Sequence, residues 1–248
     1  MRDMSRWLLP GLLVLVVVML VVLTTPSSTR SLRYEASLEV LQETARIDVG
    51  SDPFIILSAD TDSDDQPDLL VTSTGTGTLS VIRNHGKEGF GKPQVYSLSP
   101  GTFGVAAGDL NGNSHVDLVV SNERTSTLTL LLNDGNGLFS SRIDIPTGGG
   151  PHVTAVADFN GDSVADIASP NYHVNSVSVM LNIGDGTFGE SQAYAVHKQP
   201  FCAIPVDLNN DGAIDIATTS YTEGCVDILW NDGDGGFNTR SSVELGSG

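Results

Sequence analysis

The chain has 248 residues, and its 30 aspartates and glutamates against 12 lysines and arginines give a net charge of −18 at pH 7. So acidic a surface repels nucleic-acid backbones and anionic membranes, which excludes both as expected partners. Divalent cations are the natural counter-ions.

The N-terminus carries an apolar run from Trp7 to Leu23, preceded by Arg2 and Arg6. This pattern predicts a targeting element over residues 1–33, either a signal peptide or a membrane anchor, that is not part of the fold. Residues 34–248 are then expected outside the cytoplasm: secreted, periplasmic or anchored to the cell surface. Contact with a membrane is expected only through the N-terminal segment.

Four acidic segments follow at a constant interval of 49 residues. Each has carboxylate or amide side chains at its first, third, fifth and ninth positions. In chain order these residues are Asp60, Asp62, Asp64 and Asp68; Asp109, Asn111, Asn113 and Asp117; Asp158, Asn160, Asp162 and Asp166; and Asp207, Asn209, Asp211 and Asp215. The same interval separates Asn84, Asn133, Asn182 and Asn231. The whole unit is therefore repeated in tandem.

Hydrophobic residues within each repeat alternate with a period of two, which favours strands buried mainly on one face over helices. In the third repeat, four strands are predicted at residues 153–157, 166–169, 177–181 and 191–196. Four short strands per repeat are typical of a β-propeller blade, so the fold class is all-β. The predicted blades cover residues 53–101, 102–150, 151–199 and 200–248, and residues 45–50 align with the fourth strands as an extra N-terminal strand.

The acidic segments have the chemistry of a calcium loop. A single cluster of Asp, Asn and Gly is an ordinary turn, but four copies in one register favour metal binding. Oxygen ligands select calcium over zinc or copper, and magnesium prefers to keep its water. Position 12, where an EF-hand needs Glu, holds Val71, Val120, Ser169 and Thr218.

The ninth residue is therefore expected to close each site, together with a backbone carbonyl at position seven, from Gln66, His115, Val164 and Ala213. Up to four structural Ca²⁺ ions are predicted. The fourth loop is the most regular, because Gly212 occupies its sixth position. The second loop has only two carboxylates and is expected to bind most weakly.

These loops are similar to those of FG-GAP and VCBS-type β-propeller repeats, a family that includes the integrin α-subunit head. The resemblance covers residues 45–248. The Phe-Gly signature of the family stands at Phe90-Gly91 and Phe188-Gly189 and is altered at Phe139-Ser140 and Phe237-Asn238. The resemblance implies about seven blades, so the chain is expected to be a fragment of a larger propeller. An unclosed or self-associating array of four is the alternative.

No enzyme is expected, because the repeats contain no non-repeating carboxylate pair with suitable neighbours. The histidines occupy unrelated repeat positions and are expected at the surface or in turns: His85, His115, His152, His173 and His197. We therefore expect a non-enzymatic adhesion or partner-binding module whose protein or glycan ligand is unknown. The candidate contacts are the turns at residues 122–126, 170–175 and 221–224.

Two alternatives remain for the function. Tyr172, His173 and Tyr221 could stack on sugar rings, as in a lectin-like propeller. The chain could also be a polysaccharide-active enzyme, such as a lyase, or a non-catalytic part of one.

The two cysteines of the fourth repeat, Cys202 and Cys225, leave a further question open. An exported chain favours a disulfide between them. Regular strand spacing would instead set them about 9–10 Å apart, which is beyond an undistorted bridge.

Overall fold

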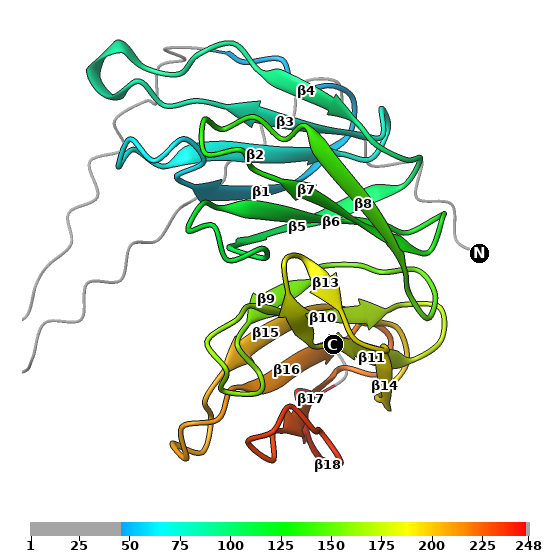
Figure 1. Cartoon of the computed structure of the whole chain (residues 1–248). Coiled ribbons are helices and arrows are strands. Elements are labelled where there is room, and N and C mark those ends of the chain that lie inside the picture. Colours follow the sequence, from blue (N-terminus) through cyan, green and yellow to red (C-terminus); the bar gives the residue numbers. More distant parts are fainter. Residues whose placement is uncertain (1–45, 247–248) are drawn as a thin grey trace, which may run out of the picture. The chain divides into compact units, whose positions relative to one another are not determined.

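The computed structural model describes residues 46–246, and the targeting element predicted at residues 1–33 lies outside them (Figure 1). Within the described range, no helix is long and apolar enough to cross a membrane. The strands form four-stranded antiparallel sheets, each within one 49-residue repeat. The prediction of an all-β fold built from β-propeller blades is therefore confirmed.

The first two sheets are simple meanders in which neighbouring strands follow one another along the chain. The first sheet contains β1 (Pro53–Ala59), β2 (Asp68–Ser73), β3 (Thr78–Ile82) and β4 (Gln94–Ser97), with the 3-10 helix η2 (Gly86–Glu88) between the last two. The second sheet contains β5 (Thr102–Gly108), β6 (Asp117–Asn122), β7 (Thr127–Leu132) and β8 (Ser141–Pro146).

The third and fourth sheets repeat this order. The third sheet contains β9 (Ala155–Ala157), β10 (Asp166–Asn171), β11 (Ser176–Met180) and β14 (Gln192–Ala195), with a small hairpin of β12 (Asn182–Gly184) and β13 (Thr187–Phe188) before its last strand. The fourth sheet contains β15 (Pro200–Val206), β16 (Asp215–Ser220), β17 (Cys225–Trp230) and β18 (Thr239–Glu244).

Residues 46–50 do not form the extra strand that the repeat register predicts. A strand needs a partner, and the third strand of each described sheet is already paired on both sides. Instead, the carbonyl of Val49 accepts hydrogen bonds from the hydroxyls of Ser73 (2.7 Å) and Ser80 (3.4 Å) in the first sheet.

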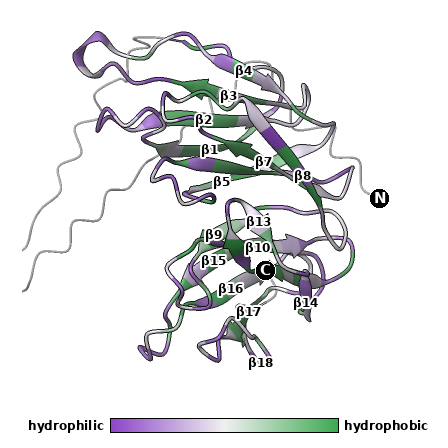
Figure 2. Cartoon of the chain, viewed as in Figure 1, coloured by the Kyte–Doolittle hydropathy of each residue, from purple (hydrophilic) through white to green (hydrophobic). Residues whose placement is uncertain are grey.

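Neighbouring sheets pack face to face through three apolar clusters. Leu118 and Val120 of β6 face the cluster shared with the first sheet, whereas Val119 between them belongs to the cluster shared with the third. A third cluster joins the third and fourth sheets through residues such as Val177 and Leu229. Figure 2 shows hydrophobic residues concentrated in the strands and hydrophilic ones in the loops.

The expectation that strands are buried mainly on one face is wrong for the middle of the array. Every residue of β6 and of β11 is buried, because a sheet covers each of their faces. In the last sheet, β17 and most of β16 show the expected alternation of buried and half-buried residues. Strand polarity alone does not reveal this, since serine and threonine fill many of the buried positions.

An aromatic cluster joins the first strands of three repeats and a residue just before the first strand, β9, of the third. Its members occupy one repeat position and are Phe54, Phe103, His152 and Phe201. Phe103 lies 4.2 Å from Phe54 and 4.1 Å from His152, and Phe201 lies 5.1 Å from His152, between ring centroids. Phe54 and Phe201, from the first and fourth repeats, are 6.4 Å apart. We call this group the axial cluster.

The expectation that His152 lies at the surface or in a turn is wrong, because it takes a phenylalanine position in this cluster and is only 4% exposed. The structure also answers the question of a disulfide between the two cysteines. Cys202 and Cys225 are both free thiols, and Cys225 is buried.

Candidate functional site

The four acidic loops, residues 60–68, 109–117, 158–166 and 207–215, connect the first and second strands of each sheet. In the fourth loop, Asp207 accepts hydrogen bonds from the backbone N–H groups of Asn210 (2.7 Å) and Gly212 (3.0 Å). Asp60, Asp109 and Asp158 make the equivalent bonds in the other loops. The carboxylate of the first aspartate thus organises each turn by accepting hydrogen bonds from the loop's backbone N–H groups.

The sixth loop residue adopts a left-handed conformation in every copy. Its φ is 93° at Gly212, and 64°, 66° and 69° at Asp65, Ser114 and Ser163. The three non-glycine residues therefore adopt the turn at some steric cost. Four loops of different sequence thus share one backbone conformation at this position, although only one of them has glycine there.

The ninth aspartate is fully buried in all four loops: Asp68, Asp117, Asp166 and Asp215. In the third loop, Asp166 accepts hydrogen bonds from the N–H groups of Phe159 and Asn182, both at 2.8 Å. The other three aspartates accept the same pair of bonds, from the second loop residue and the repeat asparagine. Burial raises the pKa of Asp117 and Asp166, and these backbone bonds oppose that rise.

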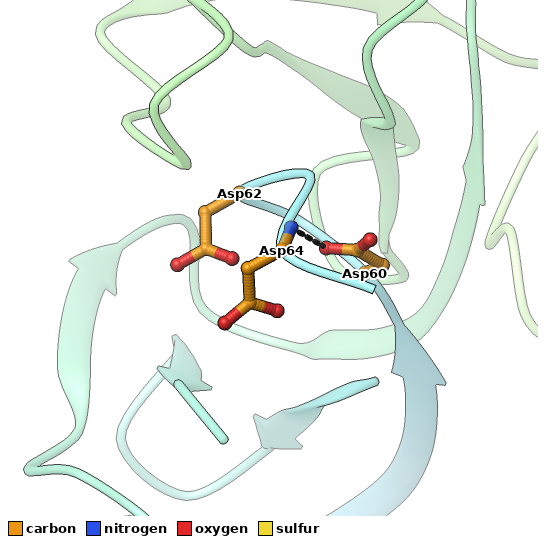
Figure 3. Close-up of side chains that lie close together, drawn as sticks. All are labelled: Asp60, Asp62 and Asp64. Carbon is orange, nitrogen blue, oxygen red and sulfur yellow. Dashed lines mark hydrogen bonds between the residues drawn. The ribbon is translucent and has the colours of Figure 1, made fainter. Parts of the chain in front are cut away.

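The first loop brings three carboxylates together, as Figure 3 shows. One oxygen from each of Asp60, Asp62 and Asp64 lies within 4.8 Å of the others, and no second group of three acidic, histidine or cysteine ligands is so close within residues 46–246. Asp62 also pairs with Arg83, 3.1 Å away. Burial, and then the nearby charges of Asp68 and Asp64, raise the pKa of Asp62.

One oxygen of this group has no partner. Asp62 Oδ1 is buried and accepts no hydrogen bond. A buried, unsatisfied carboxylate oxygen beside two further carboxylates is costly without a cation. The donor set, oxygen only, therefore fits a hard divalent cation such as calcium.

The other loops differ at the third and fifth positions. The amide nitrogens of Asn160 and Asn209 donate to Asp162 (2.9 Å) and Asp211 (2.7 Å). Rotation of either amide by half a turn would present its oxygen to an ion instead.

In the second loop, Asn113 donates to the carbonyl of Asn133 (3.0 Å). The position-seven residues Gln66, His115, Val164 and Ala213 each donate their N–H to the fifth side chain.

The repeat asparagines link one sheet to the preceding one, a role that the sequence did not assign to them. The Asn182 amide nitrogen donates to the carbonyls of Leu110, in the preceding acidic loop (2.8 Å), and Ala165, in its own (3.0 Å). Asn133 and Asn231 make the same pair of bonds. The 49-residue interval of these asparagines was the sequence signal that could have revealed this role.

The turns between second and third strands, which the sequence suggested as candidate contacts, lie close together. Glu123 lies 3.1 Å from His173, and the rings of Tyr172 and Tyr221 are 6.3 Å apart. A cleft of about 630 Å³ opens beside them, lined by Tyr172, His173, Asn175, Lys198, Gln199, Thr222 and Glu223. Sequence reasoning missed Lys198 and Gln199, which precede β15.

The model of the FG-GAP-like repeat matches residues 60–120 and 109–169. No curated protein matches the sequence.

Several solved structures are similar in fold. An Agrocybe aegerita lectin, studied for recognition of non-reducing terminal N-acetylglucosamine, has a TM-score of 0.55 and 22% identity, over 78% of this chain and 52% of that one. BBS1N, in complex with ARL6DN, has a TM-score of 0.56 and 12% identity, over 83% and 57%. The dihydro-heme d1 dehydrogenase NirN has a TM-score of 0.53 and 13% identity, over 79% and 39%.

These likenesses concern the fold alone, because every identity is low. The present chain also spans only about half the length of the lectin and BBS1N chains that it matches. Since the three structures include a dehydrogenase as well as a lectin, the shared fold does not indicate one activity.

Proposed function

We propose that the chain is a calcium-stabilised, non-enzymatic binding module that acts outside the cytoplasm in adhesion or partner recognition. Residues 60–169 match FG-GAP-like repeats, and the sheets are folded as β-propeller blades. The observation that carries the proposal is the first acidic loop. Asp60, Asp62 and Asp64 converge there, and Asp62 Oδ1 is buried without a partner.

The acidic loops explain why the role of the ion would be structural. Each loop joins two strands of one sheet, and its ninth aspartate is already fixed by backbone N–H groups. Bound calcium supplies the positive charge that offsets the crowded carboxylates. Since the loop has this geometry only when folded, a ligand of the loop stabilises the folded state by mass action.

One arrangement that could resemble a catalytic triad does not have the order a nucleophile needs. Asp227 is fully buried and accepts bonds from His197 Nδ1 (2.8 Å) and Ser242 (2.7 Å). The serine therefore contacts the carboxylate and not the imidazole, which is the wrong order for a nucleophile activated by a base. Export is proposed from the apolar run Trp7 to Leu23, which lies outside the described residues.

Calorimetric titration of calcium into the full chain tests this proposal. We expect about four ions per chain, with the weakest site in the second loop. Titration with magnesium is the matched control and should give much weaker heats. A chain that is folded by circular dichroism but takes up no calcium would contradict the proposal.

A second candidate function is carbohydrate binding, and the cleft beside the turns favours it. Polar side chains and the aromatic Tyr172 line that cleft together. The lectin with a similar fold is consistent with this candidate but does not establish it, given 22% identity.

A further inference from the structure

The cleft combines groups from two neighbouring repeats. Tyr172, His173 and Asn175 come from the turn of the third sheet, and Thr222 and Glu223 come from the turn of the fourth. Lys198 and Gln199, just before β15, complete the lining. Its volume of about 630 Å³ falls in the range of small-molecule sites, roughly 300–1,000 Å³.

Two lining residues of the cleft carry side chains where the preceding repeat has glycine. Lys198 and Gln199 stand where the preceding repeat has Gly149 and Gly150. Gln199 keeps a left-handed φ of 56°, close to the 61° of Gly150. A glycine would adopt this conformation without steric cost, so the fold does not require a glutamine here. Strain retained for a side chain is typical of a functional position.

The ionisable groups that line the cleft pair with opposite partners. Lys198 lies 3.2 Å from Glu223, and His173 lies 3.1 Å from Glu123. The backbone N–H of Lys198 also donates to Glu223 (3.0 Å), and this bond lowers the pKa of the Glu223 carboxyl. Among the lining residues, Lys198 and Glu223 offset each other, so the lining carries no net formal charge and suits a neutral ligand better than a charged one.

The uncharged groups suit a ring that carries many hydroxyls. The ring of Tyr172 stacks on buried His152 at 4.3 Å and 8°, which fixes its orientation. Gln199 Oε1 is buried without a hydrogen-bond partner, so rotation of this amide toward a ligand in the cleft would break no bond of that oxygen. Asn175, whose Oδ1 accepts from Gln199 N–H (3.1 Å), still has its amide donors to offer.

We propose that this cleft binds the terminal ring of a neutral carbohydrate through Tyr172, Gln199 and Asn175. The inference rests on the proposed function as a binding module and gives that module a site and a ligand class. Amide groups donate to and accept from sugar hydroxyls, and the fixed tyrosine supplies a rigid apolar surface.

The test uses the full 248-residue chain in mild detergent with millimolar calcium. It is applied to an array of neutral glycans that end in N-acetylglucosamine, galactose, glucose, mannose or fucose, beside sialylated and sulfated glycans. We expect binding to one or more neutral termini. The double variant Lys198→Gly/Gln199→Gly, which restores the glycines of the preceding repeat, should weaken that binding at least about tenfold, as should Thr222→Trp, which fills the cleft.

The matched control is Val174→Ser, an exposed residue of the same turn that does not line the cleft. It should bind as the unaltered chain does. Binding to none of the glycans by a folded chain, binding to anionic glycans alone, or unchanged binding by both cleft variants would each overturn the inference. Calcium uptake is measured separately, so a chain that binds neutral glycans but no calcium would refute the calcium proposal and leave this one standing.

Discussion

Replacement of Asn182 by alanine should weaken the contact between the third sheet and the second. Asn182 is buried, its amide nitrogen bonds Leu110 and Ala165, and its Oδ1 accepts from the N–H of Gly184 (3.0 Å). Three lost hydrogen bonds at roughly 1 kcal/mol each predict a loss of about 2–4 kcal/mol in the free energy of unfolding. Part of that loss arises because the two carbonyls stay buried without this donor.

The matched control is Asn84→Ala at the same repeat position. Asn84 is half-buried, and its side chain bonds only Pro67 (3.1 Å) and Gly86 (3.0 Å) in its own repeat. Its loss should cost about 1 kcal/mol or less.

Urea unfolding of both variants, at one fixed calcium concentration, gives the comparison. Equal losses for the two variants would refute the idea that the asparagine stabilises the contact between sheets.

Three further outcomes are expected. Chelation of calcium should lower the melting temperature of the chain, and an unchanged melting curve would count against structural calcium. Asp62→Asn should weaken calcium binding to the first loop, yet it should not lower the melting temperature of the chelated protein, because it removes charge repulsion beside Asp64 and Asp68. Burial lowers the pKa of His152 to about 4, with Glu123 opposing and His173 adding to that shift. Below about pH 6.5 the imidazole of His152 is therefore protonated in the unfolded chain but not in the folded one. The free energy of unfolding should fall by up to about 3 kcal/mol as the pH drops from 6.5 to 4. His152→Phe, which restores the aromatic residue of the other repeats, should abolish this step in urea unfolding followed against pH.

The sequence was sufficient for the repeat, the strands and the loops. A constant interval of 49 residues and a hydrophobic period of two are local properties, so they predict blades without knowledge of packing. The left-handed sixth loop residue was also predictable, because Gly212 reveals the backbone conformation that Asp65, Ser114 and Ser163 adopt at a cost.

Features that depend on the neighbouring sheet were not predictable in the same way. Thr129 and Ser178 read as solvent-facing in the alternating pattern but are buried, because sheets cover both faces of β7 and β11. His152 looked unrelated to the other histidines, and its alignment with three phenylalanines becomes informative only once those rings are known to meet. The cleft likewise needs two turns from different repeats in one place.

The axial cluster changes how the array can open. A linear stack of repeats would fray independently from each end, since every unit touches only its neighbours. Here Phe54 of the first repeat contacts Phe201 of the fourth, so the two ends of the array share an aromatic contact. Local unfolding of one end is thereby coupled to the other, and slow amide exchange should extend to both terminal sheets together rather than decline from the middle outward.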